Sequence, residues 1–575
     1  MPGGAGGPRV CEVMNLLARV VTPLAAALVL AWSHPAEACG CFAPPSAAEP
    51  IVQAGERILF SIEGGKVTAH IQIQYAGDAK DFGWLLPLPS VPILKLGSDE
   101  LFTRLSATTQ PEYTLTQVRG TGCATPSSGF GCFCASPSLI DRTQPNAQGG
   151  GPSPVVITSS IGPYDYAVLR ADDKTAMLTW LADNRYFVPT GVDGAVDPYI
   201  HPGAYFLALK LKAGASTGDV TPVVLEYPSA LPMIPLILTS VGATPNMGVQ
   251  VFLLGNGRGI PRNFHHVVLN DALLDWANGA KNYSALVTQA VSEAPRKHAF
   301  VTEYAGTSAV MKDQLVFPGR FGSQATLAQS ATPQDFVAEL LRTGFDLSTR
   351  GPGSVFSSPV IRLLLTDIPY PPALAAKGID ENEFLTRLDY YLGAYRTQNP
   401  ADFQNYTLAF DAPSLAQQIF DQYVTPLKEA NALFAKFPKL TRLITTLSPE
   451  DMTSDPVFSF NPDLPDVSRS HTATLTVNCG APSQLLTEQG WLVDGVATGT
   501  LPPEISVTPV ALRVEVLGEE GPATEVTDNK DTIHQRFANR TDPGRAPGAP
   551  QGCATIDPMS LGLLVLMANL RRRRR

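Results

Sequence analysis

Apolar and polar residues alternate in the first half of the chain, which is the pattern of strands with one buried face. The clearest case places apolar side chains at Val67, Ala69, Ile71, Ile73 and Tyr75. Shorter β-rich runs, separated by prolines and glycines, follow at Tyr205–Lys212, Val223–Tyr227, Leu236–Val241 and Val249–Leu254. The first half is therefore predicted to form antiparallel sheets joined by tight turns.

In the second half, the apolar residues take up helical spacing. The stretch Asn270–Glu293 is predicted to be helical on this ground. Thr332 and Pro333 predict the start of another helix, because the hydroxyl can cap a free amide and proline suits the first turn; Gly344 predicts its end. Two more helices are predicted at Asp380–Tyr395 and Ser414–Phe437, so the helical segment spans about 330–440.

Strand patterning returns at Thr472–Val477 and Glu504–Leu517, so the predicted class is α+β, with strands continuing to about 517. Residues 518–552 are polar and rich in glycine and proline, which predicts a flexible stalk. The predicted divisions are a signal peptide at 1–38, a β-rich domain at 39–265, an α+β region at 266–517, the stalk at 518–552 and a tail at 553–575.

The N-terminus has the features of an export signal. Two arginines precede the apolar stretch Val20–Trp32, and the small-x-small sequence Ala36-Glu37-Ala38 follows. Cleavage before Cys39 is therefore expected, and lipidation of Cys39 is a second reading of the same segment. A permanent anchor is disfavoured, because the apolar core is shorter than the roughly 20 residues that cross a bilayer.

The C-terminal tail consists of Cys553, a short apolar run at Met559–Leu570 and five arginines at Arg571–Arg575. Arginines stay on the cytoplasmic side of a membrane, so the tail can hold the chain at the inner membrane before processing. This pattern resembles the myxobacterial C-terminal sorting tail (MYXO-CTERM). The resemblance implies cleavage near Cys553, lipid attachment there and display at the cell surface. A plain membrane anchor is the alternative.

Composition is that of a globular, acidic protein. Apolar residues make up 44% of the chain and charged residues 16%, which is enough to form a sizeable core. The formal net charge of −10 makes nucleic acid an unsuitable partner. The expected partners are instead the membrane, through the tail, and the export and sorting machinery.

Six cysteines remain between the two terminal segments: Cys39, Cys41, Cys123, Cys132, Cys134 and Cys479. An even number in an exported chain indicates disulfides, and fifteen pairings are possible. The clustering of five of them favours links between residue 39 and the 123–134 loop. A thiolate metal site built from the Cys-x-Cys pairs is the sharper alternative, because sulfur ligands suit zinc or cuprous copper.

The sequence lacks the common catalytic motifs, namely His-Glu-x-x-His, Gly-x-Ser-x-Gly and the phosphate-binding loop. The glycine-rich stretch Gly255–Gly259 is followed by Pro261, which predicts a turn between strands rather than a nucleotide-binding loop. His265 and His266 are adjacent on a predicted strand and so point to opposite faces, which disfavours a shared metal.

Two carboxylates stand out as candidate functional groups. Glu303 and Asp81 are flanked by apolar residues, and partial desolvation raises a carboxyl pKa into a range useful for proton transfer. A structural acid that caps a turn or pairs with an arginine is the simpler reading. The densest acidic cluster, weighed as a weak calcium site against a solvated loop, contains Asp451, Asp455, Asp463 and Asp466.

Several segments, in this order, resemble the bacterial family called domain of unknown function 2330. They are Ala38–Gly40, Glu56–Phe60, Asp81–Pro89, Gly162–Asp165, Tyr205–Lys210, Met233–Leu236, Phe300–Gly306 and Leu440–Ser468. The resemblance covers about 38–480 and implies no activity, cofactor or catalytic residue. Family members commonly begin with Cys-Gly-Gly-Phe, whereas Cys41 stands here in place of the second glycine.

The sequence thus predicts an exported, envelope-anchored protein whose activity it does not reveal. Its place is the cell surface or outer envelope, with the periplasm or inner membrane as alternatives. The leading hypothesis is a non-enzymatic binding or envelope-structural protein, and the alternative is an exported enzyme such as a carboxylate-dependent hydrolase. A deep pocket lined by Glu303, Asp81 or a histidine would favour the enzyme.

Overall fold

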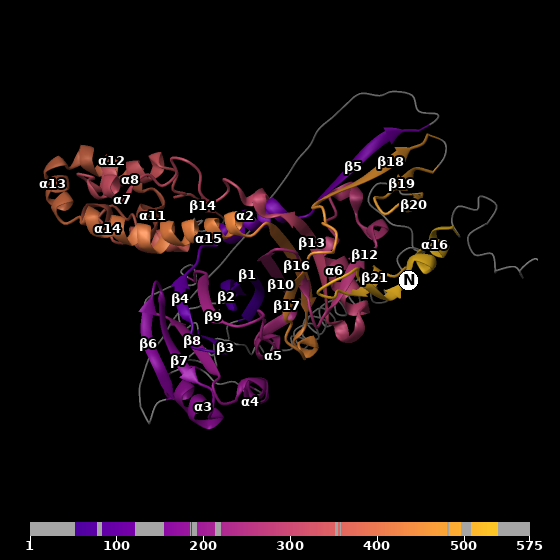
Figure 1. Cartoon of the computed structure of the whole chain (residues 1–575). Coiled ribbons are helices and arrows are strands. Elements are labelled where there is room, and N and C mark those ends of the chain that lie inside the picture. The colour runs from indigo at the N-terminus through magenta and orange to yellow at the C-terminus, as the bar shows by residue number, and fades with distance from the viewer. Residues whose placement is uncertain are drawn as a thin grey trace, which may run out of the picture.

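The computed structural model describes residues 52–76, 83–120, 154–184, 186, 192–212, 220–350, 355–356, 358–479, 482–495 and 508–538. These residues form a mixture of helices and strands, which confirms the predicted α+β class. A large central sheet is flanked by a helical lobe and by two smaller sheets, one carrying β6–β8 and the other β5 and β18–β20 (Figure 1).

The central sheet has ten strands in the order β22-β21-β12-β13-β16-β10-β1-β2-β9-β4. Their bounds are β1 (Val52–Glu63), β2 (Lys66–Ala76), β4 (Ile93–Leu96), β9 (Val223–Pro228), β10 (Ala243–Gly255), β12 (His265–Leu269), β13 (Ala299–Thr307), β16 (Lys439–Leu447), β21 (Ala511–Val516) and β22 (Thr524–Asp528). Most neighbours are antiparallel, as predicted. Two pairs depart from the prediction and are parallel, β1 with β10 and β12 with β13.

The central sheet contains strands from before and after residue 265. The domain boundary predicted at that residue therefore does not separate one sheet from another. Both of its faces are buried. Along β1, Ile58 and Phe60 belong to one apolar core and Leu59 to a second. This alternation places one core on each face of the sheet, because successive side chains of a strand point to opposite sides.

The hairpin of β1 and β2 follows directly from the sequence. Gly64 and Gly65 have φ angles of 56° and 74°, a left-handed turn that glycine adopts without strain. Val67, Ala69 and Ile71 of β2 are all buried, as predicted, but His70 on the opposite face is buried too, because the sheet has a core on each side.

A four-stranded antiparallel sheet lies beside β4, in the order β3-β8-β7-β6 (Figure 1). Its strands are β3 (Gly83–Leu88), β6 (Val155–Ile161), β7 (Tyr164–Arg170) and β8 (Tyr205–Leu211), with α3 (Lys174–Asp183) and α4 (Val192–Val196) nearby. The predicted strand at 236–241 is wrong, because the short helix α5 (Leu236–Thr239) occupies it. The amide of Ile237 donates to Asp455 Oδ1 at 2.9 Å, and this carboxylate anchors the helical turn.

The helical lobe connects β13 to β16 and forms the second core. Its main helices are α7 (Gln324–Ala328), α8 (Pro333–Arg342), α9 (Pro359–Leu365), α10 (Pro372–Ala375), α11 (Glu381–Thr386), α12 (Leu388–Gln398), α13 (Pro400–Leu408), α14 (Ala412–Ile419) and α15 (Thr425–Lys436). Thr332 caps α8, as predicted, by accepting from the Asp335 amide at 3.1 Å. The helix predicted at 380–395 is interrupted at Arg387. The helix predicted at 414–437 is interrupted by a π-helical turn at Phe420–Val424.

The helix predicted at 270–293 is shorter than expected. Only α6 (Tyr283–Glu293) is α-helical, and the 3-10 turns Asp271–Leu273 and Trp276–Asn278 precede it. Gly279 takes a left-handed φ of 61°, which ends the second turn. The larger apolar side chains before this break, Leu273 and Trp276, are still buried, which is why the apolar spacing in the sequence continues across it.

The third sheet joins residues distant in sequence, in the order β20-β19-β18-β5. Its strands are β5 (Glu112–Arg119), β18 (Ser470–Val477), β19 (Gln484–Leu486) and β20 (Leu492–Asp494); β5 follows α2 (Asp99–Thr109) and lies parallel to β18.

The predicted stalk at 518–552 requires a correction over its first part. Strand β22 pairs with β21, and α16 (Lys530–Ala538) follows it. The stretch is polar in composition, which is why the sequence predicts a stalk. Helix α16 nevertheless packs on the folded domain, because the fully buried side chain of Ile533 belongs to the first apolar core.

In the part of the chain that the structure describes, every helix is too short or too polar to cross a membrane. The predicted signal peptide and the C-terminal tail both lie outside the described residues.

Candidate functional site

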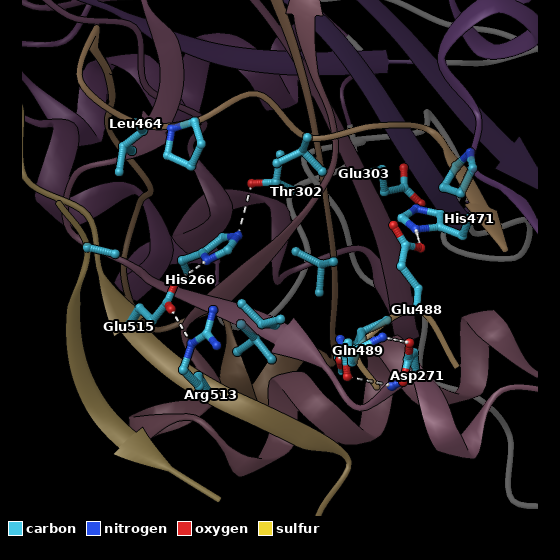
Figure 2. A pocket seen from close by; sticks show the side chains of 18 of the residues that line it. His266, Asp271, Thr302, Glu303, Leu464, His471, Glu488, Gln489, Arg513 and Glu515 are labelled. Carbon is cyan, nitrogen blue, oxygen red and sulfur yellow. Dashed lines mark hydrogen bonds and ion pairs between the residues drawn. The ribbon is translucent and has the colours of Figure 1, made fainter. Parts of the chain in front are cut away.

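A pocket of about 760 Å³ opens where the central sheet meets the β5–β18 sheet. Strands β12, β13 and β21 form one wall, and the segments 463–467 and 521–523 form another. Figure 2 shows two polar groups on opposite sides of it, one around His266 and Glu515 and the other around Asp271 and His471. This volume lies within the usual range for small-molecule sites, roughly 300–1,000 Å³.

Three residues from three neighbouring strands form a hydrogen-bonded chain on the first side. The Nδ1 atom of His266 lies 3.0 Å from Glu515 Oε2, and its Nε2 atom lies 3.0 Å from Thr302 Oγ1 (Figure 2). His266 pairs with Phe300 on β13 and with Glu515 on β21, so the strand register places the three side chains together.

The protonation of this chain follows from its surroundings. Burial lowers the pKa of His266 in spite of the nearby Glu515, so the imidazole is neutral at pH 7. Burial alone would raise the pKa of Glu515, but hydrogen bonds from His266 and Arg513 outweigh it and lower this pKa to about 2. His266 therefore donates from Nδ1 to the Glu515 carboxylate, and its Nε2 accepts.

Arg258 completes the first side. Its Nη2 atom donates to Thr302 Oγ1 at 2.9 Å, and its Nη1 donates to the Pro465 carbonyl at 3.2 Å. The side chain is 7% exposed, and its Nε–H has no hydrogen-bond partner. A buried, charged donor without an acceptor is uncommon in folded proteins.

The glycines around Arg258 allow this placement. Strand β11 (Arg258–Pro261) pairs with β17 (Phe458–Asn461). A Cβ atom on Gly257 would lie 2.7 Å from the Pro462 nitrogen, and one on Gly259 would lie 2.4 Å from the Leu253 side chain. The glycine-rich stretch is thus a tight turn between strands β10 and β11, as the sequence predicts.

Asp271 lies on the second side of the pocket. Its Oδ2 atom accepts from the Gln489 backbone amide at 2.9 Å, whereas Oδ1 is buried and makes no hydrogen bond of normal geometry, although the Thr487 hydroxyl is close enough to lower the pKa of this carboxyl (Figure 2). The residue is 7% exposed, and burial raises its pKa to about 6. His471 and Glu488 lie nearby and bond to each other, Nδ1 to Oε2, at 2.9 Å.

Aromatic side chains line the pocket on the same side as Asp271. The ring of Tyr113 lies 5.6 Å from Trp276, 5.6 Å from Tyr283 and 5.0 Å from His471, measured between centroids. All four line the pocket. Burial raises the pKa of Tyr283 well above its ordinary value, with a further contribution from the charge of Glu303, so its hydroxyl stays protonated.

The sequence of the chain also identifies its family. The family model described as an uncharacterized protein conserved in bacteria (DUF2330) matches residues 35–349. The chain belongs to this family. The match confirms the resemblance as far as residue 349 and includes Arg258, His266 and Thr302, whereas Leu440–Ser468 and Glu515 lie beyond it. No curated protein and no solved structure matches the chain.

The sequence predicts two candidate functional carboxylates, Glu303 and Asp81. Glu303 lines the pocket. It is 3% exposed and accepts a charge-assisted bond from Arg442 Nε, itself buried. The Arg442 Nη1 atom also donates to the Ser106 carbonyl at 3.3 Å. The simpler reading, an acid paired with an arginine, thus describes its geometry. Asp81 lies outside the described residues.

The two adjacent histidines face opposite ways, as predicted for a strand. His266 points into the pocket, while His265 Nδ1 lies 3.3 Å from the carbonyl of His298.

The acidic cluster weighed for calcium is divided among separate partners. Asp451 pairs with Lys297, Asp455 accepts from Tyr199, Asp463 accepts from the Gly521 amide and Asp466 pairs with Lys439. Among the described residues, no group of three or more histidine, cysteine or acidic side chains is arranged to hold a metal ion. The calcium hypothesis therefore gains no support.

Among the candidate cysteines, Cys479 is described, and it is disulfide-bonded. Cys39, Cys41, Cys123, Cys132, Cys134 and the tail residue Cys553 lie outside the described residues. The pairing scheme and the role of Cys553 stay predictions.

Several polar pocket residues are not singled out by the sequence, among them Arg258, Asp271, Thr302 and Glu515. Thr302 adjoins Glu303, and Arg258 lies within the glycine-rich turn, so both stood next to residues that drew attention. Asp271 and Glu515 carry no local signal, because only the strand order brings them to the pocket.

Proposed function

We propose that this chain is an exported protein, held at the cell envelope by its C-terminal tail, that binds a small molecule in the central pocket. The leader and tail patterns support the location. The observation that carries the binding role is the pocket itself, in which Arg258 Nε and Asp271 Oδ1 are buried polar atoms without partners. Buried polar groups are nearly always hydrogen-bonded, and both residues line the pocket, so a bound molecule that reaches these atoms would supply the missing bonds.

Native mass spectrometry of the full chain, isolated from its own envelope, tests the binding role. The expected result is a mass above that of the polypeptide and its attached lipid, and this excess is lost on denaturation. Asp271→Asn should lower the occupied fraction, while the matched change Asp402→Asn, on the exposed helix α13, should not. Equal native and denatured masses for protein from its native envelope would contradict the proposal.

The same preparation tests the location. Peptide mapping should place the N-terminus at Cys39 and should find no residue upstream of His34. Chain recovered only from the cytoplasm, with its leader intact, would contradict export without bearing on the pocket.

A second function, ester hydrolysis, is favoured by the Glu515–His266–Thr302 chain. This order of carboxylate, imidazole and hydroxyl is the arrangement of a nucleophilic triad. Thr302 Oγ would bond to the ester carbonyl carbon while its proton passes to His266 Nε2. The departing alcohol oxygen takes that proton, and water then hydrolyses the acyl-Thr302 ester. Arg258 lies beside Thr302 Oγ1 and would stabilise the negative charge that develops on the carbonyl oxygen.

Turnover of 4-nitrophenyl acetate by the full chain tests this second function. Thr302→Val, which keeps the shape and removes the hydroxyl, should abolish turnover, whereas Thr302→Ser should retain it. Glu515→Gln should lower kcat by about 100-fold or more, because His266 loses the charge that stabilises its protonated form. Equal turnover by Thr302→Val and the unaltered chain would exclude Thr302 as nucleophile.

A further inference from the structure

The two partnerless atoms of the pocket have opposite electrostatic character. Asp271 Oδ1 is a carboxylate oxygen, and Arg258 Nε is a guanidinium donor. Asp271 belongs to one of the two polar groups in Figure 2, and Arg258 bonds to Thr302 of the hydrogen-bonded chain on the other side. A single ligand that satisfies both must therefore offer a donor at one end and an acceptor at the other.

The Asp271 side is suited to an ammonium group. Among the described residues no lysine or arginine forms an ion pair with Asp271, and Glu488, which bonds to His471, adds a second negative charge nearby. Tyr113 and Trp276 line the same side, and their rings attract a cation through its contact with the aromatic face.

The Arg258 side is suited to an anionic oxygen. The carboxylates around it are already bonded, since Glu515 accepts from Arg513 and His266 and Asp463 accepts from the Gly521 amide. Asp466 pairs with Lys439. The Nε–H of Arg258 therefore stays available, and a charge-assisted bond to an anion is the strongest interaction open to it.

Apolar side chains lie along the pocket together with the two polar groups. Val268, Leu269, Leu274 and Val301 belong to its lining. Building on the proposed binding role, we propose that the pocket takes a bipolar ligand, with an ammonium group at Asp271, an anionic oxygen group at Arg258 and an aliphatic segment joining them.

Isothermal titration calorimetry of the full chain with ω-amino acids, from 4-aminobutanoate to 8-aminooctanoate, tests this ligand class. The series covers a range of separations between the two charges. We expect one member to bind at least about tenfold more tightly than both of its single-charge analogues, the alkylamine and the alkanoate of equal length. Each lost charge-assisted bond leaves a buried group unpaired, which is the reason for the difference.

Two variants test which residue of the pocket binds the ammonium end of the ligand and which binds its anionic end. Asp271→Asn keeps an oxygen for the Gln489 amide and should weaken the ω-amino acid about tenfold, while leaving the alkanoate unchanged. Arg258→Gln should weaken the ω-amino acid and leave the alkylamine unchanged. Asp402→Asn serves as the control for both, and the thermal unfolding of each variant is compared with that of the unaltered chain.

Two results would overturn the bipolar ligand. One is that no ω-amino acid binds more tightly than both of its analogues, and the other is that affinity is unchanged by Asp271→Asn. If a single-charge analogue still binds, the pocket remains a binding site and only the ligand class is wrong. If no probe binds and the protein from its own envelope carries no bound molecule, the proposed binding role fails as well.

Discussion

Asp271 makes the stability of this protein depend on pH in an unusual direction. Its pKa is about 6 in the folded chain and about 3.8 when unfolded, so the folded state holds an extra proton between these values. Stability therefore falls as pH rises from about 4 to 6. Asp99, whose pKa burial also raises to about 6, contributes in the same direction.

The variant Asp271→Asn should remove the part of the pH dependence of stability that Asp271 contributes. Compared with the unaltered chain, we expect it to gain on the order of 3 kcal/mol in free energy of unfolding between pH 4 and pH 7, as an upper bound. Urea unfolding at both pH values measures the difference. A constant difference between the two proteins would show that Asp271 does not titrate in this range.

The pair of Glu303 and Arg442 predicts a large stability effect at a single residue. Both side chains are buried, so Glu303→Gln leaves an arginine charge without its counter-ion and should cost about 3 kcal/mol. The double variant Glu303→Gln, Arg442→Met should recover part of that loss. The exposed-site change Glu488→Gln, measured in the same unfolding experiment, should cost less than about 1 kcal/mol. A loss of that small size for Glu303→Gln would mean that water reaches the pair.

The sequence draws attention to Glu303 but not to Glu515, which lies in the same pocket, and the difference has one cause. An acid among apolar residues is visible locally, whereas His266 and Glu515 lie 249 positions apart. Their pairing depends on β12 and β21 being adjacent in the sheet, and no local pattern encodes strand order. The carboxylate, imidazole and hydroxyl chain could not be assembled before the topology was known.

At the scale of elements, helix α8 gives the clearest test. Thr332 is half-buried and caps the Asp335 amide, so Thr332→Ala should destabilise the lobe by about 1 kcal/mol. Thr386→Ala, at the end of α11, removes a threonine hydroxyl without removing an N-cap and serves as control. Thermal unfolding of both variants measures the difference. Equal midpoints for the two would show that this cap adds nothing.

Elements with a local cause were predicted well from the sequence. Strand β2 has its alternating apolar residues, and α8 has its threonine cap and proline. Helix α5 was predicted as a strand, because the bond that fixes it comes from Asp455, which is 218 positions away. The parallel pairing of β1 with β10 was missed for the same reason.

At the scale of the whole molecule, a substitution in the C-terminal tail should change where the protein is located in the cell. If the tail is a sorting signal, Cys553→Ala should leave the protein folded but held at the inner membrane with its arginines attached, because cleavage and lipid attachment need that thiol. Cell fractionation and surface proteolysis compare the variant with the unaltered chain. Equal surface exposure of the two would leave a plain membrane tether as the explanation of the tail.

The helical lobe leaves the sheet at Thr307 and returns at Lys439, and these two residues pair across β13 and β16. A loop of about 130 residues must therefore close before the middle of the sheet can form, and its closure entropy is smallest if the helices have already condensed. Their contacts are local, so they form early, whereas β1 must wait for β10. For a chain that emerges from a translocon N-terminus first, β1 would lack β10 until residue 255 has crossed, and β10 would lack β16 until residue 447 has crossed. Its folding on the far side would therefore depend on protection from aggregation during that interval.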